Sequence, residues 1–327
     1  MKLIEQNIVR DVNIHESLVD NKICFLDIET TGVNRNKDSI YLIGIVYFDD
    51  SIKSWKIIQL FADELKEEVD ILLGAYNIIS KFDVIVNYNG ESFDIPFINS
   101  KLSFYKTNLS IDINKSLDLF RIIKANRNIL DLDNLKLESV EQYLGIYRQD
   151  KFTGRECIDI YFDYLITKNI ESKDHVLLHN YEDLYYLLDV IKIIDMLEDI
   201  KCFHIEYNNN KNNFHINSLK LDNDYLFIEG RIKNNHIRNT IYFADNYKII
   251  ISEDDTFEVS FEVHEAKLNP TQKCTYLKAV NYGLPKNVHY GEKKYAPRGI
   301  IIITIEKNYC IENIKQLVTH LIDNILK

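Results

Sequence analysis

Three apolar segments near the N-terminus constrain the fold of this chain most strongly. They lie at Ile23–Ile28, Ile40–Phe48 and Trp55–Phe61, and β-branched and aromatic residues are frequent in them. Because the links between them are short, they predict three strands that pair as an antiparallel meander. The first segment is bounded by polar residues and is typical of a buried strand.

The chain then alternates between helical and strand patterns. We expect a helix at Ala62–Phe82, a strand at Val84–Tyr88, a helix from about Asp94 to Tyr105 and a strand that ends near Leu117. Further helices are expected at 119–125, 137–144, 156–168 and 173–197. An antiparallel meander extended by parallel strands with crossover helices gives a mixed sheet that helices cover on both faces. The fold class predicted for this part is α/β.

The pattern changes after about residue 205, where apolar stretches follow one another at short spacing. Strands are expected at 225–232, 240–243, 247–252, 256–263, 274–280 and 299–306, followed by a helix at 311–326. This predicts a second, mostly-β domain with a C-terminal helix. We expect the two domains to span 1–203 and 214–327, with Asn208–Asn213 as the linker and 283–299 as a long loop.

Composition excludes several classes of protein. The net charge is −11, so a broad basic coat is excluded. Residues 1–200 carry 22 Lys and Arg against 35 Asp and Glu, whereas residues 201–327 carry 17 against 15. The chain has no apolar run long enough for a membrane span, no signal-peptide pattern at its start, and five scattered cysteines without a CxxC pair. We therefore expect a cytoplasmic protein without a membrane partner.

The first candidate site lies at the end of the first strand, in FLDIETTG (25–32). Asp27 and Glu29 are two residues apart, so their side chains point to the same face of the strand. Two carboxylates buried together are costly unless a cation compensates them, and Mg²⁺ and Mn²⁺ prefer carboxylate oxygens. Taken alone, the pair is more often two solvated acids at a strand end.

Two further motifs carry acids. NYNGESFDIPF (87–97) follows the expected strand at 84–88, and Asp94 in it is either a metal ligand or an ordinary helix N-cap. HVLLHNYED (175–183) places His179 and Asp183 four residues apart on one helix face. His179 could act as a base beside Asp183 as a metal ligand, or the two residues could form an exposed ion pair. Together with His175 they could also form a zinc site.

The three motifs in this order resemble those of the DnaQ-like 3′–5′ exonucleases, which have a ribonuclease H-like fold. Several other stretches are similar to the YprB-type ribonuclease H-like domain in particular. They are IYLIGIVYF (40–48), SLDLF (116–120), LKLESVEQYLGIYR (135–148), DKFTG (150–154) and YFDYL (161–165). The resemblance covers about residues 20–200 and nothing in 201–327.

The resemblance implies a metal-dependent nuclease with two Mg²⁺ or Mn²⁺ ions. Its metal ligands would be Asp27, Glu29, Asp94 and Asp183, with Asp27 shared by both ions. His179 would orient or deprotonate the attacking water. Histidine-type exonucleases usually place this histidine five residues before the last aspartate, whereas here the gap is four, as in the tyrosine-type members and the YprB-type domain.

Substrate contacts are also implied or suggested. Thr30, Thr31 and Gly32 follow the first motif, where family members contact the 3′-terminal nucleotide, although these residues equally suit a turn. Asn89 and Phe93 match the lead-in to the second motif. Arg121 and Arg148 are candidate phosphate contacts or, by default, solvated surface arginines. Asp118 is an outer acid or, more simply, a helix cap. A basic, aromatic loop at 283–299 suits single-stranded nucleic acid, although a charge run in a loop is usually only solvated. The loop contains Lys286, Tyr290, Lys293, Lys294, Tyr295 and Arg298.

Two functional hypotheses follow. The first is a 3′–5′ exonuclease acting on DNA or RNA, with single-stranded ends favoured; a structure-specific endonuclease would share the same residues. The second is a nucleic-acid- or protein-binding module that keeps the fold without catalysis. The complete set of Asp27, Glu29, Asp94, His179 and Asp183 favours the enzyme.

Overall fold

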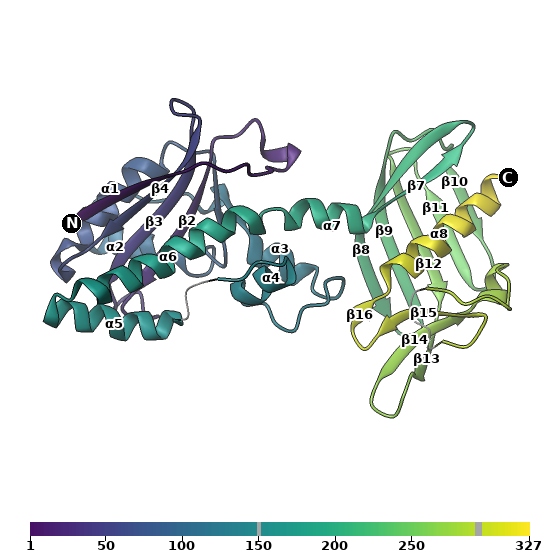
Figure 1. Cartoon of the computed structure of the whole chain (residues 1–327). Helices are drawn as coiled ribbons and strands as arrows, with labels where there is room; N and C mark the ends of the chain where they lie inside the picture. The colour runs from purple at the N-terminus through teal and green to yellow at the C-terminus, as the bar shows by residue number, and fades with distance from the viewer. Residues whose placement is uncertain (149–151, 292–295) are drawn as a thin grey trace. The chain divides into compact units, whose positions relative to one another are not determined.

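The computed structural model describes residues 1–148, 152–291 and 296–327 (Figure 1). The chain divides into two compact units. Unit 1 comprises Met1–Ala125 and Leu132–Ile194, and unit 2 comprises Asn126–Asp131 and Asp195–Lys327. The division falls within α7 (Ile193–Lys201), earlier in the chain than the interval between 203 and 214 expected from the sequence.

Unit 1 contains a six-stranded mixed sheet with the order β1-β4-β3-β2-β5-β6. Its strands are β1 (Lys2–Ile8), β2 (Ile23–Thr30), β3 (Ile40–Asp49), β4 (Ser54–Phe61), β5 (Val84–Asn87) and β6 (Ser116–Asp118). The pairs from β1 to β2 are antiparallel, and β5 and β6 extend the sheet in parallel. The predicted meander with a parallel extension is therefore confirmed.

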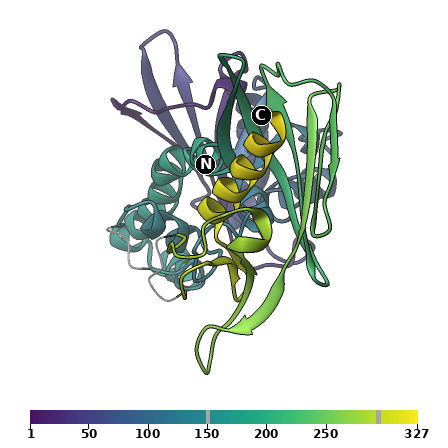
Figure 2. The ribbon, with the colours of Figure 1, turned by 90° about the vertical axis from the view of Figure 1, so that its right-hand side faces the viewer.

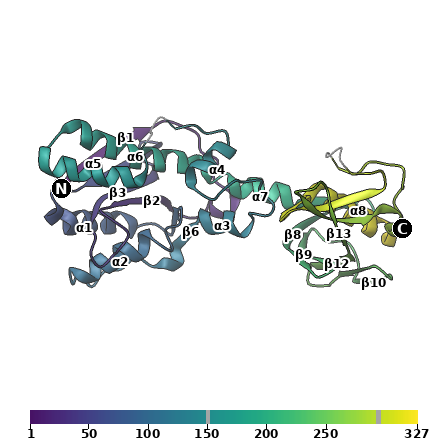
Figure 3. The same cartoon turned by 90° about the horizontal axis from the view of Figure 1, so that it is seen from below.

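Helices cover both faces of this sheet. They are α1 (Glu68–Ile79), α2 (Asp94–Phe104), α3 (Leu119–Ala125), α4 (Leu137–Tyr143), α5 (Gly154–Thr167) and α6 (Ile170–Val190). Figure 3 shows α5 and α6 on one side of β2 and β3, with α1 and α2 on the other. Short 3₁₀ helices lie at Glu16–Leu18, Leu65–Glu67 and Ile113–Lys115. The mixed α/β fold class predicted for this part is confirmed.

The core of unit 1 joins the meander to the helices on the side of α6. Tyr41 of β3 and Tyr161 of α5 are fully buried, and their rings stack with centroids 3.9 Å apart. The Tyr161 hydroxyl donates a hydrogen bond to the Ala62 carbonyl at 3.0 Å, so its polar atom has a partner inside the core. These contacts fix α5 against β3 and the end of β4.

Some expected elements of unit 1 differ from the structure. The strand β1 was missed, because it is an edge strand with mostly exposed side chains and lacks an apolar signature. The helix expected from Ala62 begins as α1 at Glu68. The helix expected at 173–197 is two helices, α6 and α7; α6 begins earlier because the Asn169 side chain accepts a hydrogen bond from the Glu171 amide.

Unit 2 is built from antiparallel strands in two sheets. The larger sheet has the order β10-β11-β12-β9-β8-β7, and the smaller has the order β13-β14-β15-β16. The strands are β7 (Cys202–Tyr207), β8 (Asn210–Asp222), β9 (Tyr225–Lys233), β10 (Thr240–Phe243), β11 (Tyr247–Ile251), β12 (Thr256–Glu262), β13 (His264–Lys267), β14 (Lys273–Lys278), β15 (Ile300–Ile305) and β16 (Asn308–Tyr309). The predicted β-rich C-terminal region is confirmed.

A C-terminal helix, α8 (Ile311–Leu326), completes unit 2 and lies beside the strands in Figure 2. Its buried face carries Ile314, Leu317, Val318, Leu321 and Ile322, which belong to the same apolar cluster as Phe214, Phe257 and Phe261 of the larger sheet. A 3₁₀ helix lies at Ala279–Tyr282. No helix in the described parts of the chain is both long enough and apolar enough to cross a bilayer.

The segment Asn208–Asn213 is not a linker, contrary to the expectation from its composition. Tyr207 pairs with Asn210, so Asn208 and Asn209 form the two-residue turn of the β7–β8 hairpin. Both have positive φ, 50° and 61°, as type I′ hairpin turns require. Asn212 is fully buried, and its side-chain oxygen accepts from the His236 amide at 2.7 Å. The polar run therefore belongs to the sheet.

Gly44 provides a test of how closely α6 must approach the sheet. It pairs with Asp27 across β2 and β3, and a Cβ added there would lie 2.3 Å from Asn180 Oδ1 and 2.4 Å from Leu184 Cδ1. Gly44→Ala should therefore lower the free energy of unfolding by about 1–3 kcal/mol, the usual cost of overpacking. Denaturant unfolding measures this change.

The matched control is Gly74→Ala in α1, where an added Cβ meets nothing closer than Leu60 Cδ2 at 3.4 Å. That variant should be as stable as the wild type or more stable, because alanine favours helices. Equal stability of the two variants would contradict close packing of α6 on Gly44.

Candidate metal centre and active site

The first two acids lie in the C-terminal half of β2, a central strand of the sheet. Asp27 and Glu29 point to the face that α6 covers, while Leu26 and Ile28 are buried on the opposite face. The pairing register with β3 shifts between Glu29 and Thr30, where the strand ends. Such irregularities are common where a strand turns side chains toward a site. Glu29 is only 7% exposed, so it is not a solvated acid.

Asp94 joins the same place from the other side of β2. Its carboxylate oxygen Oδ1 accepts a hydrogen bond from the Ile28 amide at 3.1 Å, and the side chain is 5% exposed. Asp94 is the first residue of α2, and Phe93 occupies the N-cap position. The interpretation of Asp94 as a simple N-cap is therefore wrong: its carboxylate is directed at the strand that carries Asp27 and Glu29.

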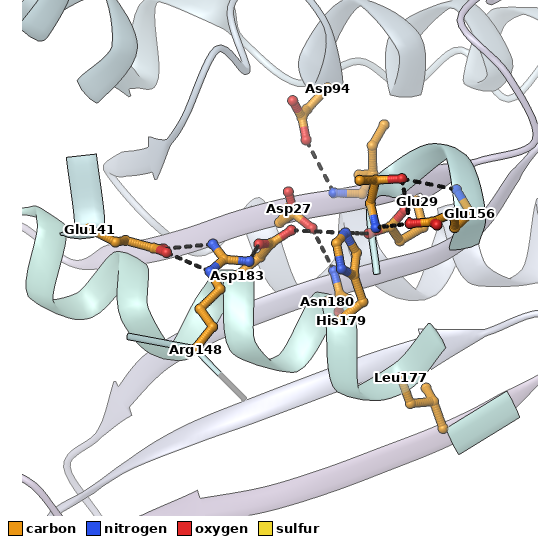
Figure 4. Close-up of polar contacts among 12 residues, drawn as sticks. Asp27, Glu29, Asp94, Glu141, Arg148, Glu156, Leu177, His179, Asn180 and Asp183 are labelled. Atoms are coloured by element: carbon orange, nitrogen blue, oxygen red, sulfur yellow. Dashed lines mark hydrogen bonds and ion pairs between the residues drawn. The ribbon is translucent and has the colours of Figure 1, made fainter. Parts of the chain in front are cut away.

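The helix α6 brings the third motif to these acids. His179 Nε2 lies 3.6 Å from Glu29 Oε1 and 3.7 Å from Asp183 Oδ2. One donor atom from each of Glu29, His179 and Asp183 lies within 4.8 Å of the others. Figure 4 shows Asp27, Glu29, His179 and Asp183 gathered between β2 and α6, with Asp94 facing them from α2. Three segments that are distant in the sequence thus converge.

His175 does not share this arrangement. Its ring packs against Phe152 with centroids 4.9 Å apart. Among the residues that the structure describes, the group able to hold a metal consists of Glu29, His179 and Asp183 and does not include His175. The zinc site considered from the sequence therefore lacks its second histidine.

A buried amide chain supports Asp27, and sequence reasoning missed it. Asn180 is fully buried, and its Nδ2 donates to Asp27 Oδ2 at 2.7 Å. The Asn180 oxygen in turn accepts from Gln59 Nε2 at 2.9 Å, and Gln59 also donates to the Leu177 carbonyl at 2.8 Å. The only sequence signal was a polar residue within an otherwise apolar stretch of β4. These amides fix the orientation of the Asp27 carboxylate.

Arg148 is neither a free phosphate contact nor a solvated surface arginine, which were the two interpretations from the sequence. Its guanidinium donates to Asp183 Oδ1 and forms two hydrogen bonds with Glu141, at 2.5 Å and 2.6 Å. Its side chain is 11% exposed, so it faces the interior of unit 1 and little of it reaches solvent. Arg148 therefore contacts one of the candidate ligands directly.

The candidate substrate residues after β2 form a turn. Thr30 Oγ1 donates to the Gly32 carbonyl at 2.7 Å, and Thr31 Oγ1 accepts from the Ser39 amide at 2.9 Å. A Cβ at Gly32 would lie 2.4 Å from Asp38 Oδ2, so the Asp38 carboxylate packs closely against this glycine in the turn. The turn interpretation is therefore supported, and it leaves the substrate role of these residues untested.

The loop after β5 holds the remaining candidates. Asn89 adopts a positive φ of 65°, and its amide donates to Asp118 Oδ1 at 2.8 Å. Asp118 also accepts from the Phe120 amide at 3.0 Å, so it caps the start of α3 as expected and also holds this loop. Phe93 packs edge-on against Phe97. Arg121 is exposed and pairs with Glu91 of the same loop.

The basic loop at 283–299 is described only in part. Lys293, Lys294 and Tyr295 lie outside the described residues. Tyr290 Oη donates to the Pro285 carbonyl at 2.7 Å, and the loop belongs to unit 2 together with Lys286 and Arg298.

The acids at the site strongly perturb one another. Burial, followed by the charges of Asp183 and Glu29, raises the pKa of Asp27 well above its usual value. Burial raises the pKa of Glu29 to about 8 and that of Asp94 to about 7. Burial alone would lower the pKa of His179, but contacts with Cys157, Asp183 and Glu29 outweigh it and raise the value to about 11. Without added positive charge the cluster therefore retains protons.

The carboxylate oxygens of this cluster fit the coordination of a divalent cation. Elsewhere in unit 1, buried acids have good partners: Glu68 accepts from the Ile40 amide at 2.7 Å and from Tyr105 Oη at 2.8 Å. Glu29 instead has one long hydrogen bond, from Tyr41 Oη at 3.4 Å, besides its contact with His179. Carboxylates with unused lone pairs in a buried cluster are the ligands that Mg²⁺ and Mn²⁺ prefer.

Comparison with known protein families agrees with this fold. The model of the RNase H superfamily matches residues 24–194, more than half of the chain, so the chain belongs to the RNase H superfamily. No curated protein matches the sequence. Membership of this superfamily and the acidic cluster support a nuclease, that is, a hydrolase acting on nucleic acid.

Two solved structures are distantly similar. One is the family B DNA polymerase from the hyperthermophilic archaeon Pyrobaculum calidifontis, with 13% identity, a TM-score of 0.42, and coverage of 55% of this chain and 25% of that chain. The other is exonuclease I in complex with the inhibitor BCBP, with 14% identity, a TM-score of 0.29, and coverage of 64% and 55%. The matched region spans about a quarter and about half of those proteins, respectively.

The raised pKa values predict how stability depends on pH in the absence of metal. A carboxyl whose pKa is higher in the folded state binds more protons when folded, so stability increases as pH falls from that value toward the unfolded value. For Glu29 this window runs from about pH 8 down to its ordinary value of 4.5, and for Asp94 it runs from about pH 7 down to 3.8. His179 acts in the same direction, because its contribution is complete below 6.5 and is lost as pH rises through about 11.

We therefore expect the chelator-treated protein to melt at a lower temperature at pH 8.5 than at pH 6.5, and Mn²⁺ to raise the melting temperature at pH 8.5. The Glu29→Gln variant should show a smaller difference between the two pH values. Thermal unfolding followed by circular dichroism measures both effects. A melting temperature that is higher at pH 8.5 without metal would contradict this account of the cluster.

Proposed function

We propose that unit 1 is a metal-dependent 3′–5′ exonuclease that hydrolyses phosphodiester bonds at DNA or RNA ends, with single-stranded ends favoured. The observation that carries the proposal is the convergence of Asp27, Glu29, Asp94 and Asp183 with His179. A structural role alone does not require four acids and a histidine to meet at the end of a strand, since burying like charges together opposes folding.

The four acids would hold two Mg²⁺ or Mn²⁺ ions. Bound there, the ions would supply Lewis-acid stabilisation of the phosphate oxygens and of the leaving 3′ oxygen. Asp27 suits a shared ligand, because Asn180 occupies Oδ2 from one direction and the other oxygen carries no hydrogen bond from the residues that the structure describes. Asp94 is fixed by the Ile28 amide through Oδ1 in the same way.

His179 is the group placed to handle the proton of an attacking water. Glu29 and Asp183 flank it, and together they favour its protonated form. Cations held by those acids would weaken their attraction for the proton of His179 and would lower its pKa toward the range in which imidazole exchanges protons with water. His179 would then orient or deprotonate the water, as a general base does.

Substrate would lie against the turn at Thr30–Gly32 and the loop that carries Asn89 and Phe93. Arg121 is exposed and available to a phosphate if its pair with Glu91 opens. Because residues 1–200 have an excess of acids, substrate binding would depend on bound metal ions and a few cationic side chains, not on a basic surface.

The first test is digestion of end-labelled single- and double-stranded DNA and RNA with Mg²⁺ or Mn²⁺. Wild-type protein should release single nucleotides from 3′ ends, and Asp27→Asn should lower the rate by on the order of 10²–10³-fold, as removal of one electrostatic stabiliser does. Asp174→Asn is the matched control, since Asp174 is an exposed acid on the same helix as Asp183.

Three outcomes of that digestion would contradict part or all of the proposal. Internal cleavage products would instead indicate an endonuclease. No activity on any substrate, combined with no metal binding, would favour a binding module without catalysis. Equal activity of wild type and Asp27→Asn would show that Asp27 does not contribute to catalysis.

A second test isolates His179. The variant His179→Asn should lower kcat by about 10²–10⁴-fold, the usual contribution of general acid–base catalysis, with a smaller effect on Mn²⁺ affinity because all four acids remain. Steady-state kinetics and calorimetric titration measure the two quantities. A variant with unchanged kcat would show that another group handles the proton.

A further inference from the structure

The site contains a cation of its own that the proposed mechanism does not use. Arg148 lies 35 residues before Asp183 in the chain, just after α4, and donates from Nη1 to Asp183 Oδ1. A guanidinium stays protonated in proteins, so this contact places a permanent positive charge beside one of the four acids. The side chain is 11% exposed and the pair is largely shielded from solvent.

The two oxygens of Asp183 have different surroundings. Oδ1 accepts from Arg148, whereas Oδ2 faces His179 Nε2 at 3.7 Å. Oδ2 lies on the side of Glu29, because His179 Nε2 is also 3.6 Å from Glu29 Oε1. Arg148 thus binds Oδ1 of Asp183, while Oδ2 points toward the acidic cluster. The contact restrains rotation of the carboxylate about the Cβ–Cγ bond.

Arg148 is itself held by a buried acid. Glu141 of α4 is 1% exposed and accepts from Arg148 Nε at 2.5 Å and from Nη2 at 2.6 Å. This fork fixes the plane of the guanidinium, and Nη1 is left free to reach Asp183. A lysine cannot reproduce it, because an ammonium has no planar fork. Glu141 lies in α4 and Asp183 lies in α6, and these two helices pack against each other.

The charges explain why such a device is useful here. Asp183 lies close to Glu29, and two carboxylates at such a short distance repel each other. A guanidinium at Oδ1 offsets this repulsion without occupying Oδ2. Glu141 compensates the charge of Arg148, so the cluster as a whole keeps its negative charge for metal.

We propose that Glu141 and Arg148 form a positioning pair that holds Asp183 through its Oδ1 and directs its Oδ2 into the metal site. This inference rests on the proposed function, because it assigns a role to the partners of a candidate metal ligand. Outer partners of this kind contribute about 10–100-fold to metal affinity or activity in other metal sites. The opposite possibility is that Arg148 competes with metal for Asp183.

The test is calorimetric titration of the full-length protein with Mn²⁺, paired with nuclease rates measured over a range of Mn²⁺ concentrations. Arg148→Met should weaken Mn²⁺ binding by about 10–100-fold and raise the Mn²⁺ concentration for half-maximal rate by a similar factor. Arg148→Lys should fall between this variant and the wild type, because it restores a charge without the fork.

Two further variants separate positioning from folding. Glu141→Gln/Arg148→Met removes both charges, so neither is left buried alone, and it should weaken Mn²⁺ binding as Arg148→Met does. The matched control is Arg10→Met: Arg10 also pairs with an acid of α6, Asp189, but that pair lies outside the acidic cluster. It should lower the melting temperature while leaving Mn²⁺ affinity unchanged.

Each outcome decides between the alternatives. Unchanged Mn²⁺ affinity in both Arg148→Met variants would overturn the inference, and tighter binding would overturn it in favour of competition. Wild-type protein that binds Mn²⁺ in an Arg148-dependent way but cleaves nothing would support the positioning pair and contradict the proposed function. Wild-type protein without an Mn²⁺ site would overturn both.

Discussion

Repulsion among buried carboxylates is the constraint on which the rest of unit 1 depends. Asp27 and Glu29 leave the same strand toward the same face, and Asp94 and Asp183 are brought to them from two helices. In a low-dielectric environment this arrangement opposes folding unless protons or cations neutralise it. The raised pKa values of Asp27, Glu29 and Asp94 express that cost. A chain that retains such a cluster must compensate it through the packing around it.

That packing is visible around α6. The absence of a side chain at Gly44 lets this helix lie against β3, and the buried amides of Gln59 and Asn180 join it to Asp27. On the other side, Glu141 and Arg148 engage Asp183. The candidate metal ligands therefore lie on a strand and on helices, and buried polar side chains hold two of them, Asp27 and Asp183, in place. A precise ion site requires such an arrangement. The acidic balance of residues 1–200 does not argue against a nuclease, because part of it is concentrated in this cluster.

The sequence predicted the meander and the parallel extension, because each depends on local pattern. The structure also brings together the five candidate site residues that the family resemblance implied. Period-two alternation in a strand places Asp27 and Glu29 on one face, and four-residue spacing in a helix does the same for His179 and Asp183. Polar supports are different: nothing near Gln59 or Arg148 in the sequence indicates that their partners lie 121 and 35 residues away. For that reason the sequence left Arg148 as either a phosphate contact or a solvated surface arginine. The Asn208–Asn209 turn was hidden by asparagine-rich composition, although two such residues with positive φ are typical of a tight hairpin.

The central claim is that Asp27, Glu29, Asp94 and Asp183 bind divalent cations. The most direct measurement is anomalous diffraction at the manganese edge from crystals of the full-length protein soaked in Mn²⁺. The account predicts two anomalous peaks among these four carboxylates, with Asp27 in contact with both. A well-diffracting soaked crystal with the four side chains ordered and no anomalous peak among them would contradict it.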